Sequence, residues 1–183
     1  MSKKSPVTTI VAIGIGAALF FVLGRFVAIP SPIPNTNISI QYGLLAFMAA
    51  LFGPVAGLLI AFIGHALIDF SYGWGVWWSW VFASGIAGLI MGLLMMNISI
   101  EDKFGKSEII RFNIAQIIAH IVAWGLVAPV LDILIYAEPA NKVFTQGLVG
   151  GIANIITTAI VGTLLAVAYS KAKPKAGSLK KED

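Results

Sequence analysis

The sequence predicts an all-α integral membrane protein, with about six transmembrane helices packed into one compact bundle. Hydrophobic residues make up 58% of the 183 residues and charged residues only 11%. The mean hydropathy is +0.93, far from the composition of a soluble domain. Cysteine is absent, which excludes disulfides, thiolate metal sites and cysteine nucleophiles. We expect residues 1–171 to form the six-helix domain and the basic segment 172–183 to be a disordered tail.

Breaks in the apolar pattern set the expected limits of the spans. The segment "IPSPIPNTN" contains three prolines and cannot continue the first helix. The second span is too short to cross a bilayer, so its helix either begins inside this loop or is shielded by neighbouring helices. Pro129 is expected to kink or break the fifth span. The expected spans are residues 7–29, 40–52, 55–70, 76–96, 109–136 and 143–169.

The basic residues indicate the orientation of the chain in the membrane. Ten of the twelve lysines and arginines lie in three clusters that flank apolar spans, at residues 3–4, 103–111 and 171–181. With six spans, all three clusters fall on one side, and the positive-inside rule predicts that this side and both termini are cytoplasmic. We therefore attribute the excess of basic residues to membrane orientation and not to a nucleic-acid-binding site. We expect no cleaved signal peptide, because the first apolar run is as long as a full span.

Small residues recur at helical spacing in the first and fourth spans. The first span carries Ala12, Gly14, Gly16 and Ala18, and the fourth carries Gly85, Gly88 and Gly92. Such spacing lets helix backbones approach closely in lipid. The spacing of these small residues predicts close packing between helices of the bundle. On the first helix it could alternatively form a face on which another protein docks.

Five charged or titratable side chains fall inside the expected spans, where each is costly and hints at function: Arg25, His65, Asp69, His120 and Asp132. His65 and Asp69 are one helical turn apart and share a face. Because the third helix runs outward, Asp69 should lie near the external mouth with His65 one turn below. Arg25 and one of the aspartates could alternatively form a buried pair that only fixes helix packing.

A polar and aromatic stripe is predicted on the fifth span, where Gln116, His120 and Trp124 follow at one-turn spacing. This stripe favours pocket lining, although a lone histidine can simply bond a neighbouring backbone group. A second aromatic group lies between the third and fourth spans and at the start of the fourth. It comprises Tyr72, Trp74, Trp77, Trp78 and Trp80. Aromatic belts anchor helices at the membrane surface, but this density also offers a stacking surface for a flat organic ligand.

Enzymatic patterns are weak in this chain. The "GKS" at residues 105–107 lacks the earlier glycine of a phosphate loop. No HExxH or G-x-S-x-G pattern occurs. The evidence for a metal site formed by His65, Asp69 and His120 is weak, because the two histidines lie on different helices. We therefore predict no catalytic residues, no metal site and no cofactor bound by the chain.

These features together resemble the S-components of energy-coupling-factor (ECF) transporters. The resemblance rests on six helices, the small-residue stripe, the proline-rich loop and "LFGPVAGLLIAFIGHALIDF". "VAIGIGAALF", "IPNTNI" and "GWGVWWSWV" are similar to a subfamily that includes a cobalamin-specific member. The resemblance implies a substrate-capturing subunit that works with a T-component and two ATPases, which would use ATP and magnesium. It also implies a vitamin pocket at the external helix ends.

By position, the resemblance makes residues 30–39, with Asn35 and Asn37, the loop that closes the pocket. Ala12, Gly14, Gly16 and Ala18 become the docking stripe. Position 2 is serine, whereas the cobalt and nickel branch uses an N-terminal histidine, which argues against a metal-ion substrate. The candidate substrate-binding residues are Asn35, Asn37, His65, Asp69, Tyr72, Trp74, Trp77, Trp78, Gln116, His120 and Trp124.

The function predicted from these observations is vitamin capture in the cell membrane, with cobalamin as the first candidate because the mouth is wide, aromatic and poor in charge. A riboflavin-like or thiamin-like molecule is the alternative within the class. Two other classes stay open. One is a solitary proton-coupled carrier that uses His65 and Asp69 as a relay, and the other is an assembly protein without a substrate.

Overall fold

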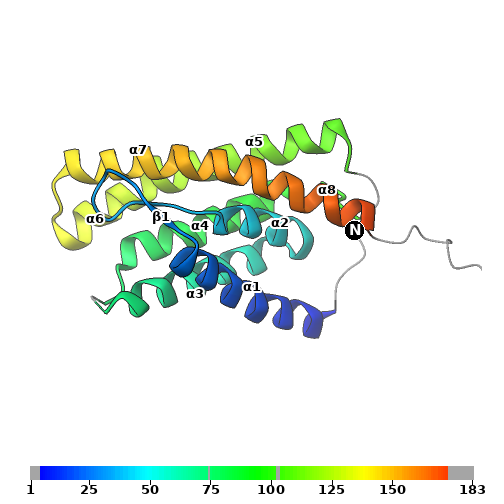
Figure 1. The fold of residues 1–183 in the computed structure, drawn as a ribbon, viewed down its shortest axis with the longest axis horizontal. Helices are drawn as coiled ribbons and strands as arrows, with labels where there is room; N and C mark the ends of the chain where they lie inside the picture. The colour runs from blue at the N-terminus through cyan, green and yellow to red at the C-terminus, as the bar shows by residue number, and fades with distance from the viewer. Residues whose placement is uncertain (1–4, 74, 102–103, 173–183) are drawn as a thin grey trace, which may run out of the picture.

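The computed structural model describes residues 5–73, 75–101 and 104–172, and these are almost entirely helical (Figure 1). The predicted all-α bundle is confirmed, and each of the six expected apolar segments is helical, although the second is short. The elements are α1 (Pro6–Phe26), β1 (Ile29–Pro30), β2 (Asn37–Ile38), α2 (Gln41–Phe52), α3 (Pro54–Tyr72), α4 (Trp78–Met95), α5 (Lys106–Val122), the π-helical turn η1 (Ala123–Val127), α6 (Ala128–Tyr136), α7 (Ala140–Thr157), the π-helical turn η2 (Thr158–Gly162) and α8 (Thr163–Ala172). The predicted tail lies outside the described residues, apart from Ala172 at the end of α8.

Both ends of the bundle carry the segments that the topology predicts. The start of α1, the start of α5 and the end of α8 lie together at one end (Figure 1). The turn from α3 to α4 and the turn from α6 to α7 lie at the other end, and the β1–β2 segment extends towards it. Five helices are long and apolar enough to cross a membrane, so the chain has the form of a multi-pass membrane protein.

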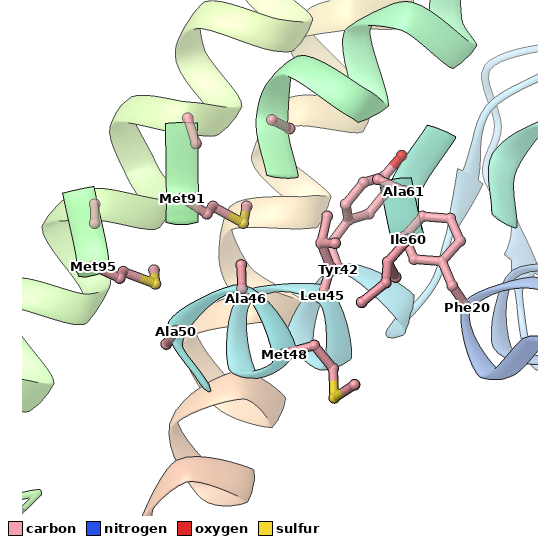
Figure 2. Close-up of a cluster of buried hydrophobic side chains, with 14 of the residues drawn as sticks. Phe20, Tyr42, Leu45, Ala46, Met48, Ala50, Ile60, Ala61, Met91 and Met95 are labelled. Carbon is pink, nitrogen blue, oxygen red and sulfur yellow. The ribbon is translucent and has the colours of Figure 1, made fainter. Parts of the chain in front are cut away.

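Helix α2 is only 12 residues long, about 18 Å at 1.5 Å per residue, yet it is the centre of the bundle. Nine of its residues are buried, and its side chains pack against α1, α3 and α4 in the core of Figure 2. Leu45 and Ala46 are fully buried there. The surrounding helices, and not its own length, therefore keep α2 out of contact with lipid, as the shielding alternative predicted.

Glycines bring α3 and α4 into backbone contact. A Cβ atom added to Gly88 would collide with the carbonyl group of Gly57, and one added to Gly92 would lie 2.6 Å from the nitrogen of Pro54. Gly85, on the same helix, would meet its neighbour Phe62 at an ordinary 3.5 Å. The fourth-span glycines thus serve internal packing, as expected for small residues in lipid.

The small-residue stripe of α1 divides between two faces. Ala12 and Gly16 are buried, and a Cβ on Gly16 would lie 2.7 Å from Ile60 Cδ1. Gly14 and Ala18 are exposed, and nothing lies within 4 Å of a Cβ on Gly14. One small pair therefore packs α1 onto the bundle, while the other is left on its outer surface.

Pro129 does not break the fifth span. Helical structure continues from Lys106 to Tyr136, and the π-helical turn η1 directly precedes the proline. The amide of Ala128 bonds the carbonyl of Ala123, the wider i→i+5 pairing of a π-turn. This shift in pairing lets the helix pass the residue that lacks an N–H group.

Candidate functional site

A cavity of about 420 Å³ lies beneath the segment that joins α1 to α2. Residues of this segment and of α2, α3, α4, η1, α6 and α7 contribute to its walls. Asn35, Asn37, His65, Asp69, Tyr72, Trp77 and Trp124 are the predicted site residues found in its lining. The further lining residues are Gly24, Thr36, Ser39, Gln41, Tyr42, Ile68, Trp80, Asp132, Lys142, Gln146, Gly150 and Asn154.

The roof of the cavity is a small hairpin. Strands β1 and β2 pair antiparallel, with Ile29 opposite Ile38. Asn35 has a φ of +57°, a left-handed conformation that asparagine tolerates better than most residues. Gln146 Nε2 of α7 donates to the carbonyl oxygen of Pro34 at 2.9 Å. The proline-rich loop is thus an ordered cover fastened at its tip to α7.

Asp132 holds the aromatic wall of the cavity in place. Its Oδ1 accepts from Trp77 Nε1 at 2.5 Å and from the hydroxyl of Ser79, which is fully buried. Its Oδ2 accepts from Trp80 Nε1 at 3.0 Å. Trp80 in turn stacks on Trp124, with ring centroids 5.7 Å apart and an angle of 19°. One carboxylate of α6 therefore fixes the start of α4 and two indoles that face the cavity.

A polar chain connects three helices behind the opposite wall. Asp69 Oδ2 accepts the backbone N–H of Trp77 at 3.0 Å, and its Oδ1 lies 3.6 Å from His65 Nε2. The other ring nitrogen of His65 is 2.5 Å from Ser84 Oγ, which is 2.7 Å from the hydroxyl of Tyr42. The pair His65 and Asp69 thus positions Tyr42 as well as lining the cavity.

Two of the predicted site residues, Gln116 and His120, lie outside the cavity lining. Both are fully buried. His120 hydrogen-bonds Thr158 at 3.1 Å and accepts from Trp124 Nε1 at 2.9 Å, while Gln116 donates to the carbonyl of Ile155 at 3.3 Å. These side chains join α5 to α7 and η2 and support the wall from behind.

The remaining predicted aromatic and cationic residues face elsewhere. Trp78 is 44% exposed and stacks on Phe62 at 6.0 Å, and Trp74 lies outside the described residues. The guanidinium of Arg25 sits 4.2 Å from the ring centroid of Tyr72. Within the described part of the chain Arg25 has no ion pair with a carboxylate, so the alternative of a buried arginine–aspartate pair is not what the structure shows.

The described residues contain no group of three or more histidine, aspartate or glutamate side chains placed to hold a metal ion. The arrangement offers instead what a small-molecule site needs: a concave cavity, aromatic walls and a few placed polar groups.

Comparison with known proteins supports this interpretation. Residues 4–171 match the family model described as "ECF-type riboflavin transporter, S component". The chain belongs to this family. S-components are the substrate-binding subunits of ECF transporters and are not enzymes, so the resemblance found in the sequence is confirmed, together with the prediction that the chain is not an enzyme.

Several other proteins are similar to this chain over most of its length. A UPF0397 protein of Lactococcus lactis subsp. cremoris is 54% identical, over 98% of this chain and all of that protein. Those of Lacticaseibacillus casei and Staphylococcus aureus are 51% and 52% identical, over 98% and 96% of this chain and 97% and 96% of theirs. The crystal structure of FolT bound with folic acid matches with a TM-score of 0.60 at 15% identity, covering 86% of this chain and 93% of FolT. This last match shows that the S-component fold is shared.

Several lining residues of this S-component were not singled out as site residues from the sequence. Gln146, Gly150 and Asn154 follow at one-turn spacing along α7 and all face the cavity. Two amide side chains on one face of an apolar helix are a detectable signal. Gln41 and Tyr42 carry no such signal, because they directly follow the hairpin and look like the start of an ordinary helix.

Proposed function

We propose that this S-component captures a flat, vitamin-sized organic molecule in the cavity under the β1–β2 hairpin. The observation that carries the proposal is the cavity itself, with indole and phenol rings on its walls and amides and carboxylates between them. Flat aromatic ligands stack on such rings, and the polar groups fix their orientation.

The size of the cavity favours a compact substrate over cobalamin. Its volume of about 420 Å³ falls in the lower half of the roughly 300–1,000 Å³ typical of small-molecule sites. Cobalamin, the first candidate from the sequence, is much larger than a flavin or thiamin and would require the hairpin to move aside. A riboflavin-like or thiamin-like molecule is therefore the substrate class that we propose, and cobalamin remains a prediction that the same titration tests.

Mass spectrometry of small molecules retained by the purified protein, followed by calorimetric titration in detergent, tests the proposal. We expect a retained aromatic molecule, or saturable binding of one vitamin of this size. Binding of cobalamin with higher affinity than any compact vitamin would refute the proposed size class. Substrate uptake by the chain alone that a proton uncoupler abolishes would refute the S-component mechanism in favour of a solitary carrier.

We further propose that the S-component delivers its substrate inward in complex with a T-component and two ATPases, which bind ATP and magnesium. Membership of the family supports this partnership. Both termini would then be cytoplasmic, in agreement with the basic clusters. The exposed pair Gly14 and Ala18 offers a flat strip on α1 where a partner helix can approach closely.

The docking strip is tested by replacing Gly14 and Ala18 together with leucine and measuring co-purification with the T-component. We expect loss of the complex and unchanged ligand binding, because the strip lies on the surface of α1, away from the cavity lining. Gly125→Leu is the matched control, since Gly125 is also exposed and nothing lies within 4 Å of its added Cβ. A complex that survives the double substitution would place docking on another face.

A further inference from the structure

We infer that the cavity selects a ligand that carries a positive charge, with Asp69 as the group that receives it. The inference rests on the proposed function and deepens it, because it names the chemical class of substrate within the compact vitamins. It follows from the charges of the lining, from the hydrogen-bonding state of each polar group and from the aromatic walls.

The charged groups of the lining are unbalanced. Two carboxylates, Asp69 and Asp132, face the cavity, together with one lysine, Lys142, and no arginine. Lys142 is already neutralised by Glu138, at 2.7 Å from Nζ to Oε2. The described lining therefore presents a net excess of negative charge to anything that enters it.

The two carboxylates differ in the number of hydrogen bonds that they accept from the protein. Asp132 accepts three hydrogen bonds from protein donors, so most of its capacity is used. Among the described residues, Asp69 accepts one hydrogen bond, on Oδ2 from the backbone N–H of Trp77. Its Oδ1 has His65 Nε2 at 3.6 Å, beyond hydrogen-bond distance. Asp69 is 8% exposed, and that remaining access is through the cavity that it lines.

The neighbouring polar groups also favour a ligand that donates hydrogen bonds. With the Nε2 proton of His65 directed at Asp69, His65 Nδ1 accepts from Ser84. Ser84 then accepts from the hydroxyl of Tyr42, which leaves the Tyr42 oxygen as an acceptor. Asp69 Oδ1 and the Tyr42 oxygen are thus left as acceptors at this wall of the cavity.

A cation satisfies this arrangement in a way that a neutral or anionic ligand does not. A carboxylate held in a low-dielectric site without a counter-charge is unfavourable, and a ligand ammonium, amidine or charged ring nitrogen supplies the missing partner. The faces of Trp80 and Trp124 add an attraction for positive charge. An anionic ligand meets like charge at Asp69 and at Asp132.

Three vitamins of different charge test the inference on the wild-type protein by calorimetric titration: thiamin as the cation, riboflavin as the neutral molecule and folic acid as the anion. We expect thiamin to bind most tightly and folic acid most weakly. Riboflavin or folic acid binding as tightly as thiamin, or a retained molecule without a cationic group, would overturn the inference and leave the proposed function standing. Failure of all three to bind, with no retained ligand, would overturn both.

Asp69→Asn tests the role of the charge. Asparagine keeps the shape and an oxygen that can accept the Trp77 N–H, so a purely structural role is largely preserved. We expect the dissociation constant for the cation to rise about 30-fold or more, as when one partner of a buried charge pair is removed, and Asp69→Glu to recover part of the loss. Glu108→Gln is the matched control, because it removes the same charge at the opposite end of the bundle. A change below about threefold in Asp69→Asn would refute the assignment.

Discussion

Replacing Asp132 with asparagine tests how strongly one carboxylate holds the aromatic wall of the cavity. Asparagine preserves the shape but offers one acceptor oxygen. With that oxygen in the place of Oδ1, it can still accept from Trp77 and Ser79. The amide nitrogen then takes the place of Oδ2 and confronts the indole N–H of Trp80, which donated to that oxygen at 3.0 Å. Asp132→Asn should therefore break the bond to Trp80 selectively.

The expected loss of stability is that of one interhelical hydrogen bond with its donor left unpaired. Interhelical hydrogen bonds in membrane proteins contribute about 0.6 kcal/mol on average and at most about 1.7, and a buried donor left unpaired costs about 1–3 kcal/mol. We expect Asp132→Asn to lower the free energy of unfolding by about 1–2 kcal/mol. Asp132→Ala removes all three bonds and should cost about 2–4 kcal/mol.

The assay is reversible unfolding in mixed micelles, combined with a double-mutant cycle. Trp80→Phe keeps an aromatic ring against Trp124 but has no N–H to leave unpaired. Trp80→Phe alone leaves Asp132 Oδ2 without this donor and should cost about 1 kcal/mol. The double variant Asp132→Asn, Trp80→Phe should be no less stable than Asp132→Asn alone, so the two losses do not add and the coupling energy is about 1 kcal/mol. A coupling energy near zero, or an Asp132→Asn variant as stable as the wild type, would show that the carboxylate does not hold the indole.

Three further outcomes follow from the packing and the surface. Gly88→Ala should destabilise the protein by about 1–3 kcal/mol, because the added methyl group meets backbone atoms that no rotamer change can move. Gly85→Ala is the control and should be nearly neutral in the same unfolding assay. Equal losses of stability in the two variants would contradict the close approach of α3 and α4. Gln146→Leu removes the bond to the carbonyl of Pro34 and should speed ligand dissociation about fivefold, measured by stopped flow; an unchanged rate would mean that this bond does not fasten the hairpin. Lys142→Gln breaks a partly exposed pair and should change the unfolding free energy by less than about 1 kcal/mol; a larger loss would indicate that the lysine supports the cavity wall.

The sequence predicts the spans because length and apolarity are local properties. An apolar segment inside lipid must pair its own backbone groups and therefore forms a helix whatever its neighbours are. The prolines of residues 30–39 and the Gly53–Pro54 pair fall at the expected breaks between helices, although α1 already ends at Phe26. The prediction of orientation from the basic clusters likewise uses only their positions along the chain and needs no knowledge of tertiary contacts. The number of spans, the roof segment and the S-component family could therefore be inferred from the sequence.

Which polar side chains meet in the cavity depends on how each helix is rotated about its own axis. Lipid is as apolar as the core, so apolarity alone does not tell which face of a membrane helix points inward. Trp77 reaches the cavity whereas its neighbour Trp78 lies on the outer surface, and Gln116 and His120 are buried outside the cavity lining.

Tertiary structure alone also brings together groups far apart in the chain. Asp132 meets the indole of Trp77 across 55 positions, and Gln146 meets Pro34 across 112. Close contacts such as the one between Gly57 and Gly88 set the helix rotations that make these meetings possible. The sequence by itself thus determined the helices, their order along the chain and the family, whereas the backbone packing of the assembled bundle decided which side chains face the cavity.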